Sequence, residues 1–171
     1  MQEEEIAELY DLQDRLEQNK YTRKNSLEFH GISESAYSSP EEVALKISEA
    51  LDVPVGTQDI VISHKLNNKG NKAIIAKFIS HKVNWNLYRA RTQLKSIKMT
   101  DLFPASSYAT TTEANGIYID ENLNSYRRGI MKKRRDGELL SVWSLDGTIF
   151  VKTSPAGRPI KISELEDLDH L

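Results

Sequence analysis

The architecture of this chain is set by one stretch, Leu16-Glu17-Gln18-Asn19-Lys20-Tyr21-Thr22-Arg23-Lys24-Asn25-Ser26-Leu27-Glu28-Phe29-His30-Gly31-Ile32. It begins as the end of a leucine-spaced helix and crosses a short basic hinge. It then continues as a strand, because apolar and polar residues alternate and successive side chains of a strand point to opposite faces. We therefore expect an oligomerising helix that leads into a small α/β module.

The segment before this junction is typical of a helix. Residues 3–22 contain no glycine or proline and consist mostly of good helix formers. Leu9, Leu12 and Leu16 follow the spacing of a coiled coil, over about two heptads, a length that is barely stable alone. Residues 1–24 are predicted to be the end of a longer coiled coil. An amphipathic helix packed on its own domain is the alternative.

After the junction the elements follow the order β-α-β-β-α-β. The expected strands are 26–31, 58–66, 72–79 and 116–120, and the expected helices are 40–52 and 80–95. Ser39-Pro40-Glu41-Glu42 supplies an N-cap, a first-turn proline and a capping-box glutamate to the first helix. Residues 97–103 are expected to form an extra short strand or a turn. Residues 25–121 are therefore predicted to form a split βαβ domain of the α+β class.

Residues 122–171 are predicted to form a second, smaller α+β domain. Its clearest element is a hairpin with Asp146-Gly147 at the turn, since Asp-Gly favours the tight turns that join two antiparallel strands. A helix at 122–135 precedes this hairpin. A short strand, Ile160–Ile162, and an acidic helix capped by Ser163 follow it.

The formal charge of −2 hides an asymmetry along the chain. Residues 1–20 hold seven acids and two bases, and residues 163–171 hold four acids and no base. The segment 21–162 therefore holds 21 bases and 14 acids, a net charge of +7. A basic body indicates a polyanionic partner, because neutralised phosphates release counterions. A solvated, mildly basic surface is the alternative.

Several classes of site and compartment are disfavoured. The chain has no cysteine, so disulfides and thiolate metal sites are excluded. No apolar run approaches the ~20 residues that span a bilayer, and the acidic N-terminus is no signal peptide. We expect a soluble protein of the cytoplasm, or also of the nucleus, without a membrane partner. The four histidines lack metal-ligand spacing, and no phosphate-cradling glycine loop or Ser-His-Asp signature occurs. A non-enzyme without metal or cofactor is therefore predicted.

Four motifs occur in order between residues 16 and 168. They are the junction Arg23–Ile32, Ala73–Phe78, Ile117–Leu123, and Val142–Lys152 ahead of Ile160–Ile162. Through this series the chain resembles the first-open-reading-frame proteins of LINE-class retrotransposons and the related baculovirus few-polyhedra protein family. The resemblance implies a coiled coil, an RNA-recognition-motif-like domain, and a C-terminal domain that closes against it around nucleic acid.

In the retrotransposon branch, the resemblance implies a trimeric RNA-binding and strand-annealing chaperone that coats its own transcript as a ribonucleoprotein. Carried over by position, Lys77 matches a basic residue at the end of the third strand, and Arg91 matches one near the end of the second helix. Both positions contribute to the nucleic-acid cleft in that branch. That family position is often arginine, and Lys77 replaces it in this chain, which keeps the charge and loses the bidentate phosphate contact.

Phosphate contacts are expected to dominate binding. The only aromatic residue of strand 72–79 is Phe78, which we expect in the core. His30 is then the best candidate on the sheet for stacking on a base. The six bases of helix 122–135 are the preferred phosphate contact, with a solvated helix face as the alternative. The predicted nucleic-acid-binding residues are Arg23, Lys24, Lys77, Arg89, Arg91, Arg127, Arg128, Lys132, Lys133 and Arg134.

Alternatives stay open at some of these positions. Arg23 and Lys24 either line the cleft or hinge the stalk. Trp85 or Tyr88 could stack a base, although partial burial against the sheet is favoured. Trp143 is expected in the core. The predicted function is binding of single-stranded RNA, with DNA as a second ligand, by a homo-oligomer with little sequence specificity. A protein-interaction adaptor of the few-polyhedra type and a structural self-assembly protein are the alternatives.

Overall fold

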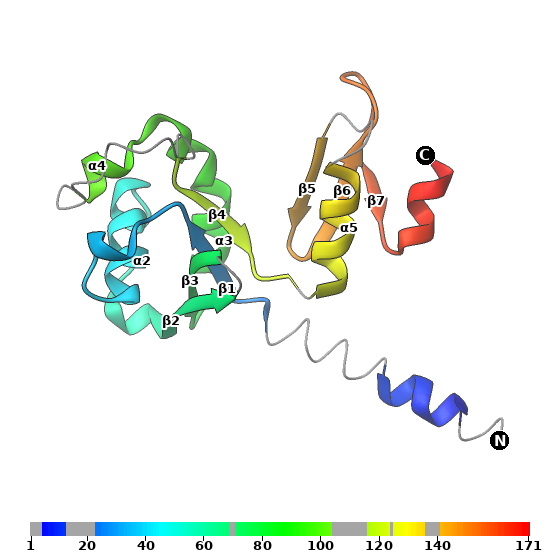
Figure 1. Cartoon of the computed structure of the whole chain (residues 1–171), viewed down its shortest axis with the longest axis horizontal. Helices are drawn as coiled ribbons and strands as arrows, with labels where there is room; N and C mark the ends of the chain where they lie inside the picture. The colour runs from blue at the N-terminus through cyan, green and yellow to red at the C-terminus, as the bar shows by residue number, and fades with distance from the viewer. Residues whose placement is uncertain (1–4, 13–22, 69–70, 104–115, 124, 136–140) are drawn as a thin grey trace. The chain divides into compact units, whose positions relative to one another are not determined.

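The structure, a computed structural model, describes residues 5–12, 23–68, 71–103, 116–123, 125–135 and 141–171 (Figure 1). The fold is of the mixed α+β class, as predicted, with a four-stranded antiparallel sheet, a three-stranded sheet and several helices. The chain divides into two compact units, Asn25–Asn122 and a second made of Met1–Lys24 with Leu123–Leu171. Within the described ranges, no helix is long and apolar enough to cross a membrane.

The unit 25–122 contains the four-stranded sheet. Its strands are β1 (Ser26–His30), β2 (Ile60–Asn68), β3 (Asn71–Phe78) and β4 (Tyr118–Glu121), and its longer helices are α2 (Pro40–Ala50) and α3 (His81–Ala90). The strand order is β2-β3-β1-β4, and every neighbouring pair is antiparallel. Since α2 follows β1 and α3 follows β3, each helix connects two parallel strands across the strand between them.

The core of this unit lies between the sheet and the two long helices. Residue pairing places Leu27 opposite Ala76, and Phe29 opposite both Ile74 and Ile119, so these side chains share one face. All of them are buried, and α2 and α3 bury their own apolar residues against the same sheet. Fully burying a side chain of this kind contributes roughly 1.5–3 kcal/mol, so this face accounts for much of the stability of the unit.

The start of α2 follows the predicted capping pattern. The Ser39 hydroxyl accepts the backbone N–H of Glu42 at 3.3 Å, and Pro40 occupies the first helical position. The Glu42 carboxylate in turn accepts the N–H of Ser38 at 2.8 Å, one residue before the cap. These bonds satisfy donors that the helix itself leaves unpaired.

Residues 91–103 differ from the prediction. The expected helix 80–95 ends at Ala90 and continues as a 3₁₀ helix, Arg91–Ser96. The strand or turn expected at 97–103 is instead the short helix α4, Met99–Leu102. Phe103 directly follows it and is fully buried, with the Lys46 ammonium 5.0 Å from its ring. The buried ring of Phe103 anchors the end of this segment in the core, a tertiary contact that a local sequence pattern does not report.

The second unit contains the three-stranded sheet, in the order β5-β6-β7. Its elements are α5 (Ser125–Arg135), β5 (Ser141–Leu145), β6 (Thr148–Lys152), β7 (Ile160–Ile162) and a 3₁₀ helix (Leu165–His170). Ile130, Ile149, Val151, Ile162 and Leu168 form its core. Asp146 and Gly147 have φ of 50° and 75°, so both have the positive φ that a type I′ turn requires, which confirms the predicted hairpin.

Two predictions for this unit are wrong. Trp143 was expected in the core, but it pairs across the hairpin with Phe150, on the face opposite Ile149 and Val151, and is only partly buried. Ser163 was expected to cap an acidic helix. The 3₁₀ helix instead begins after Glu164. The Asp167 carboxylate accepts the N–H groups of Ser163 at 2.8 Å and of Glu164 at 2.9 Å.

The N-terminal helix is described over residues 5–12. Ile6, Leu9 and Leu12 lie along it, and each side chain is more than half exposed. Residues 13–22, which hold Leu16 of the predicted coiled-coil repeat, lie outside the described residues.

Candidate nucleic-acid interface

Charge is strongly segregated within the unit 25–122. The unit holds ten Lys and Arg residues and eleven Asp and Glu residues, so it is close to neutral. Nine of the ten bases lie between Ile60 and Thr100, where neither Asp nor Glu occurs. We call residues 60–100 the basic segment. The net charge of 21–162 does not reveal the basic segment, whereas the absence of Asp and Glu from residues 60–100 is visible in the sequence.

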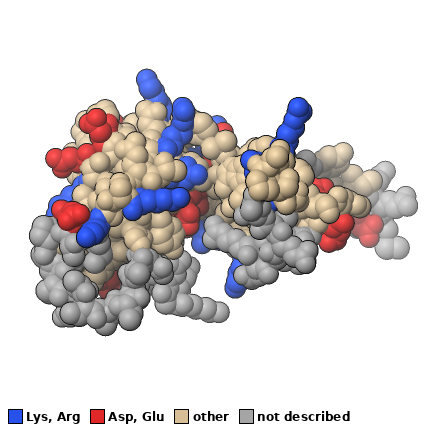
Figure 2. Space-filling view, turned by 90° about the horizontal axis from the view of Figure 1, so that it is seen from above, with Lys and Arg blue, Asp and Glu red and all other residues tan. Residues whose placement is uncertain are grey.

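The structure exposes the second half of the basic segment. Lys82 and Arg89 of α3, Lys95 of the 3₁₀ helix, and Lys98 are all exposed. Figure 2 shows blue side chains gathered over this unit, with most of the visible red ones toward its edge. The field at this surface therefore favours an anion, whatever the total charge of the unit.

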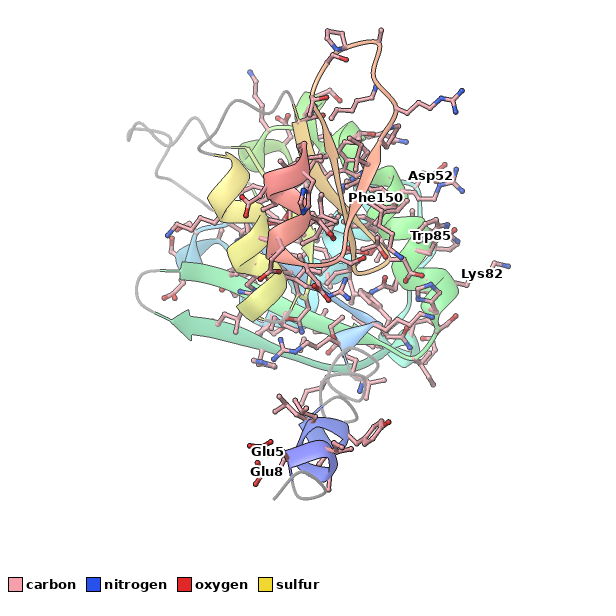
Figure 3. All side chains as sticks on the ribbon, turned by 90° about the vertical axis from the view of Figure 1, so that its right-hand side faces the viewer. Glu5, Glu8, Asp52, Lys82, Trp85 and Phe150 are labelled. Atoms are coloured by element: carbon pink, nitrogen blue, oxygen red, sulfur yellow. The ribbon has the colours of Figure 1, made fainter. Side chains whose placement is uncertain are left out.

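One face of α3 combines cations with aromatic rings. Trp85 lies four residues after His81 and three after Lys82, and Arg89 follows it by four. This spacing places the four residues on one side of the helix. Figure 3 shows Lys82 and Trp85 projecting from the same side of α3. The Arg89 guanidinium lies 6.0 Å from the Trp85 ring centroid, and the His81 ring lies 6.3 Å away. We call these four residues the α3 stripe.

The acids of this unit gather elsewhere. A groove of about 830 Å³ runs along α2 and the residues that follow it, and carboxylates and apolar side chains line it together. Its carboxylates are those of Glu41, Glu42, Glu49 and Asp52. The Lys46 ammonium, 3.0 Å from the Glu42 carboxylate, is the one cation among the described residues that line the groove, so the lining has a net negative charge. This groove is unsuited to a phosphate and suited to a cationic, partly apolar ligand.

The sheet face opposite the core is also acidic at its centre. Residue pairing places Glu28 opposite Asp120 and His30 opposite Tyr118 on this face. The His30 ring stacks on the Tyr118 ring at 4.7 Å with an interplanar angle of 2°. His30 Nε2 lies 3.4 Å from the Glu28 carboxylate and 3.8 Å from that of Asp120. Two carboxylates beside the rings oppose the approach of a phosphate.

This geometry bears on the predicted stacking residues. Phe78 is fully buried, as expected. His30, the expected candidate on the sheet, is only 8% exposed and already stacked. The prediction missed Tyr118, whose side chain is 47% exposed on the same face. Register could have found it, since His30 and Tyr118 are direct cross-strand partners.

Lys77 and Arg91, the positions carried over by resemblance, have different surroundings. Lys77 lies opposite Ser26 in β1 and Ile62 in β2, on the same sheet face as His30, and is partly buried. The Arg91 guanidinium lies 3.7 Å from the Tyr88 ring centroid and donates to the Tyr88 carbonyl at 2.6 Å. The Arg91 side chain is therefore held against the end of α3.

The predicted cluster on α5 is partly engaged within its own unit. Arg127 donates a hydrogen bond to the Gly147 carbonyl of the β5–β6 turn. Arg128 Nε donates to the Leu123 carbonyl at 2.8 Å, and Lys132 is exposed. The side chains of Lys133 and Arg134 lie outside the described residues. Two guanidiniums of the cluster therefore have structural bonds that the sequence did not reveal.

Arg23 and Lys24 lie just before β1, separated from Ser26 by Asn25, with Arg23 partly buried and Lys24 exposed. In the part of the chain that the structure describes, no group of three or more His, Cys, Asp or Glu residues could hold a metal ion. The chain matches no protein-family model, and no curated protein matches it.

Proposed function

We propose that this protein binds single-stranded nucleic acid, RNA in the first place, through phosphate contacts from the basic segment. The observation that carries the proposal is the charge segregation. Nine bases and no acid lie in residues 60–100, against eleven acids and one base in the rest of the same unit. A polyanion binding there releases counterions, and it avoids the carboxylates on α2 and on the sheet.

The topology supports the kind of domain that we propose. A four-stranded antiparallel sheet in the order β2-β3-β1-β4, with helices after β1 and β3, is the arrangement of a split βαβ domain. RNA-recognition motifs have such a sheet and stack bases on its exposed rings. With Glu28 and Asp120 in that place, we assign the phosphate contacts to α3 and the 3₁₀ helix after it. Relatedness to LINE-class first-open-reading-frame proteins, and a role as ribonucleoprotein chaperone, are part of this proposal.

Self-association is the second part. The exposed Ile6, Leu9 and Leu12 give the N-terminal helix an apolar stripe suited to pairing with copies of itself, as a trimer in the full-length protein. Several weak nucleic-acid-binding sites on one assembly then raise the overall affinity, because binding at one site increases the effective concentration of the strand at the others.

A salt titration tests the binding proposal. Fluorescence anisotropy would follow a labelled oligouridylate of about 20 nucleotides between about 50 and 200 mM NaCl. The test variant is Lys82→Glu with Arg89→Glu. The matched control is Arg158→Glu with Lys161→Glu, which makes the same charge change at exposed positions outside the basic segment.

Each lost phosphate contact lowers the slope of log K against log salt by about 0.7 for a single strand, so the test variant should lose about 1.4. If the electrostatic contribution is taken as zero at 1 M salt, affinity at 0.1 M falls about 25-fold. The control should keep most of the wild-type slope. Equal effects of the two variants, or no binding by the wild type at low salt, would refute the proposal.

A protein-interaction adaptor is the second candidate function, and the α2 groove favours it. Four carboxylates, one of them paired with Lys46, lie beside Leu45, Val53 and Pro54, and this net negative, partly apolar lining fits a basic, partly apolar peptide. Wild-type protein that binds no RNA at low salt, but retains a Lys/Leu-rich helical peptide that Glu49→Lys releases, would favour this function over the first.

A further inference from the structure

The two large rings of α3 have opposite surroundings. Tyr88 is 3% exposed, and the Arg91 guanidinium covers its ring at 3.7 Å. Trp85 is partly exposed, and Arg89, at 6.0 Å, lies at the outer limit of a cation–π contact. The His81 ring is tilted by 36° at 6.3 Å, so it is not stacked face to face on the indole. Of these two rings, only Trp85 can offer a face to a ligand.

The side of α3 opposite the α3 stripe faces the core. Asn84 and Leu87 are buried together with Tyr88, so they fix the rotation of the helix. Trp85 is therefore turned away from the core together with Lys82 and Arg89, which are both exposed. An indole between two cations on one helix face matches what a single strand presents, namely a base with a phosphate on either side.

We propose that Trp85 is a stacking platform for one unpaired nucleobase, with Lys82 and Arg89 on the flanking phosphates. This inference rests on the proposed function and deepens it, because it places base contact on a helix face and not on the sheet. Every base has a π face, so stacking here tolerates any sequence. Arg89, beside the ring, adds a cation to the same site.

A fluorescence experiment tests the platform without altering it. The chain has two tryptophans, so Trp143→Phe leaves Trp85 as the sole indole. Titration of full-length Trp143→Phe protein with oligouridylate should quench the indole emission along the same isotherm as the anisotropy of the labelled oligonucleotide. A strand of equal length with abasic sugars keeps the phosphates and removes the bases, so it should bind with little quenching.

Variants then separate stacking from structure. Trp85→Ala should weaken oligouridylate binding about 5- to 150-fold, while Trp85→Phe, which keeps a ring, should lose less. Because Trp85 contacts no phosphate in this scheme, the salt slope of Trp85→Ala should equal that of wild type, unlike that of Lys82→Glu with Arg89→Glu. Circular dichroism would verify that each variant is folded.

The outcomes distinguish the inference from the proposed function. Salt-dependent binding with no quenching of Trp85 overturns the stacking platform and leaves the proposed function standing. Equal affinity of the wild-type protein for the uridine and abasic strands would likewise overturn the stacking platform and leave the proposed function standing. Absence of binding at low salt overturns both.

Discussion

Arg127 was predicted as a phosphate contact, yet the structure predicts that changing it destabilises the C-terminal unit. Its guanidinium donates to the carbonyl of Gly147, at a turn where Asp146 and Gly147 both have positive φ. Arg127→Ala removes the donor and leaves a part-buried carbonyl without it. Lys132→Ala, on the same helix, removes the same charge from an exposed side chain and serves as the matched control.

The size of the effect follows from two opposing contributions. Hydrogen bonds to charged groups contribute about 1.5–3 kcal/mol net. Arg127 lies in the first turn of α5, where a positive charge is unfavourable by about 0.3–1 kcal/mol, and its removal offsets part of the loss. We therefore expect Arg127→Ala to lower the free energy of unfolding by about 1–2 kcal/mol. Lys132→Ala should stay within about 0.5 kcal/mol of wild type.

Urea denaturation followed by tryptophan fluorescence measures this directly. Trp143 lies in β5 of the same unit, so a Trp85→Phe background makes the signal report on that unit alone. Equal unfolding midpoints for Arg127→Ala and Lys132→Ala would refute the reasoning. The result also decides how RNA-binding data are read, because lost affinity in Arg127→Ala would then mix a lost charge with lost folded protein.

Three further predictions concern the unit 25–122 and the helix α5. Gly31→Ala should destabilise its unit by about 1–3 kcal/mol in urea denaturation, because Gly31 has φ of 84° and an added Cβ would lie 2.6 Å from the Gly116 carbonyl oxygen. Gly129→Ala, where an added Cβ meets no atom within 4 Å, should instead stabilise α5 by about 0.5–1 kcal/mol; the same sign for both substitutions would contradict this account. The N–H of Ser38 holds the pKa of Glu42 below its ordinary 4.5, so this contribution to stability is present above about pH 4.5 and is lost as pH falls through the lowered pKa. The unfolding midpoints of wild type and Glu42→Gln, measured from neutral to acid pH, should begin to approach each other below about pH 4.5 and converge once the pH is below the lowered pKa of Glu42. A difference that stays constant with pH would contradict this prediction.

The elements that could be predicted from the sequence are those that a few adjacent residues determine. Asp146-Gly147 specifies its turn because the two residues tolerate positive φ, and Ser39 begins α2 because its hydroxyl reaches an N–H three residues away. Residues 97–103 were mispredicted as a strand or turn; the short helix there ends against the buried Phe103, and burial is a tertiary feature that a local pattern does not report. Ser163 was mispredicted as the cap because the 3₁₀ helix begins one residue later, after Glu164, where the Asp167 carboxylate accepts the N–H groups of Ser163 and Glu164.

The candidate site divides in the same way. The run of bases in α5 is plain in the sequence, but the bond from Arg127 to Gly147 joins residues 20 positions apart and needs the folded hairpin. The difference between Trp85 and Tyr88 could not be predicted either, because the rotation of α3 on the sheet decides which ring is buried. The acid-free basic segment, in contrast, needs no structure to be seen.

The positions of the acidic and basic side chains also constrain how the protein would bind RNA in the proposed function. An RNA-recognition sheet stacks bases on exposed rings of its open face. Here that face carries Glu28 and His30 on the central strand β1, beside Asp120 and Tyr118 on the edge strand β4. Moving the contacts to α3 leaves phosphates and one stacked base, neither of which reports base identity. In the proposed scheme, a contact of that kind is weak and sensitive to salt in one copy, and self-association through the exposed Ile6 and Leu9 would compensate for that weakness. Linked copies make a weak, sequence-blind contact durable while each single contact remains quick to exchange, which is what annealing of strands requires.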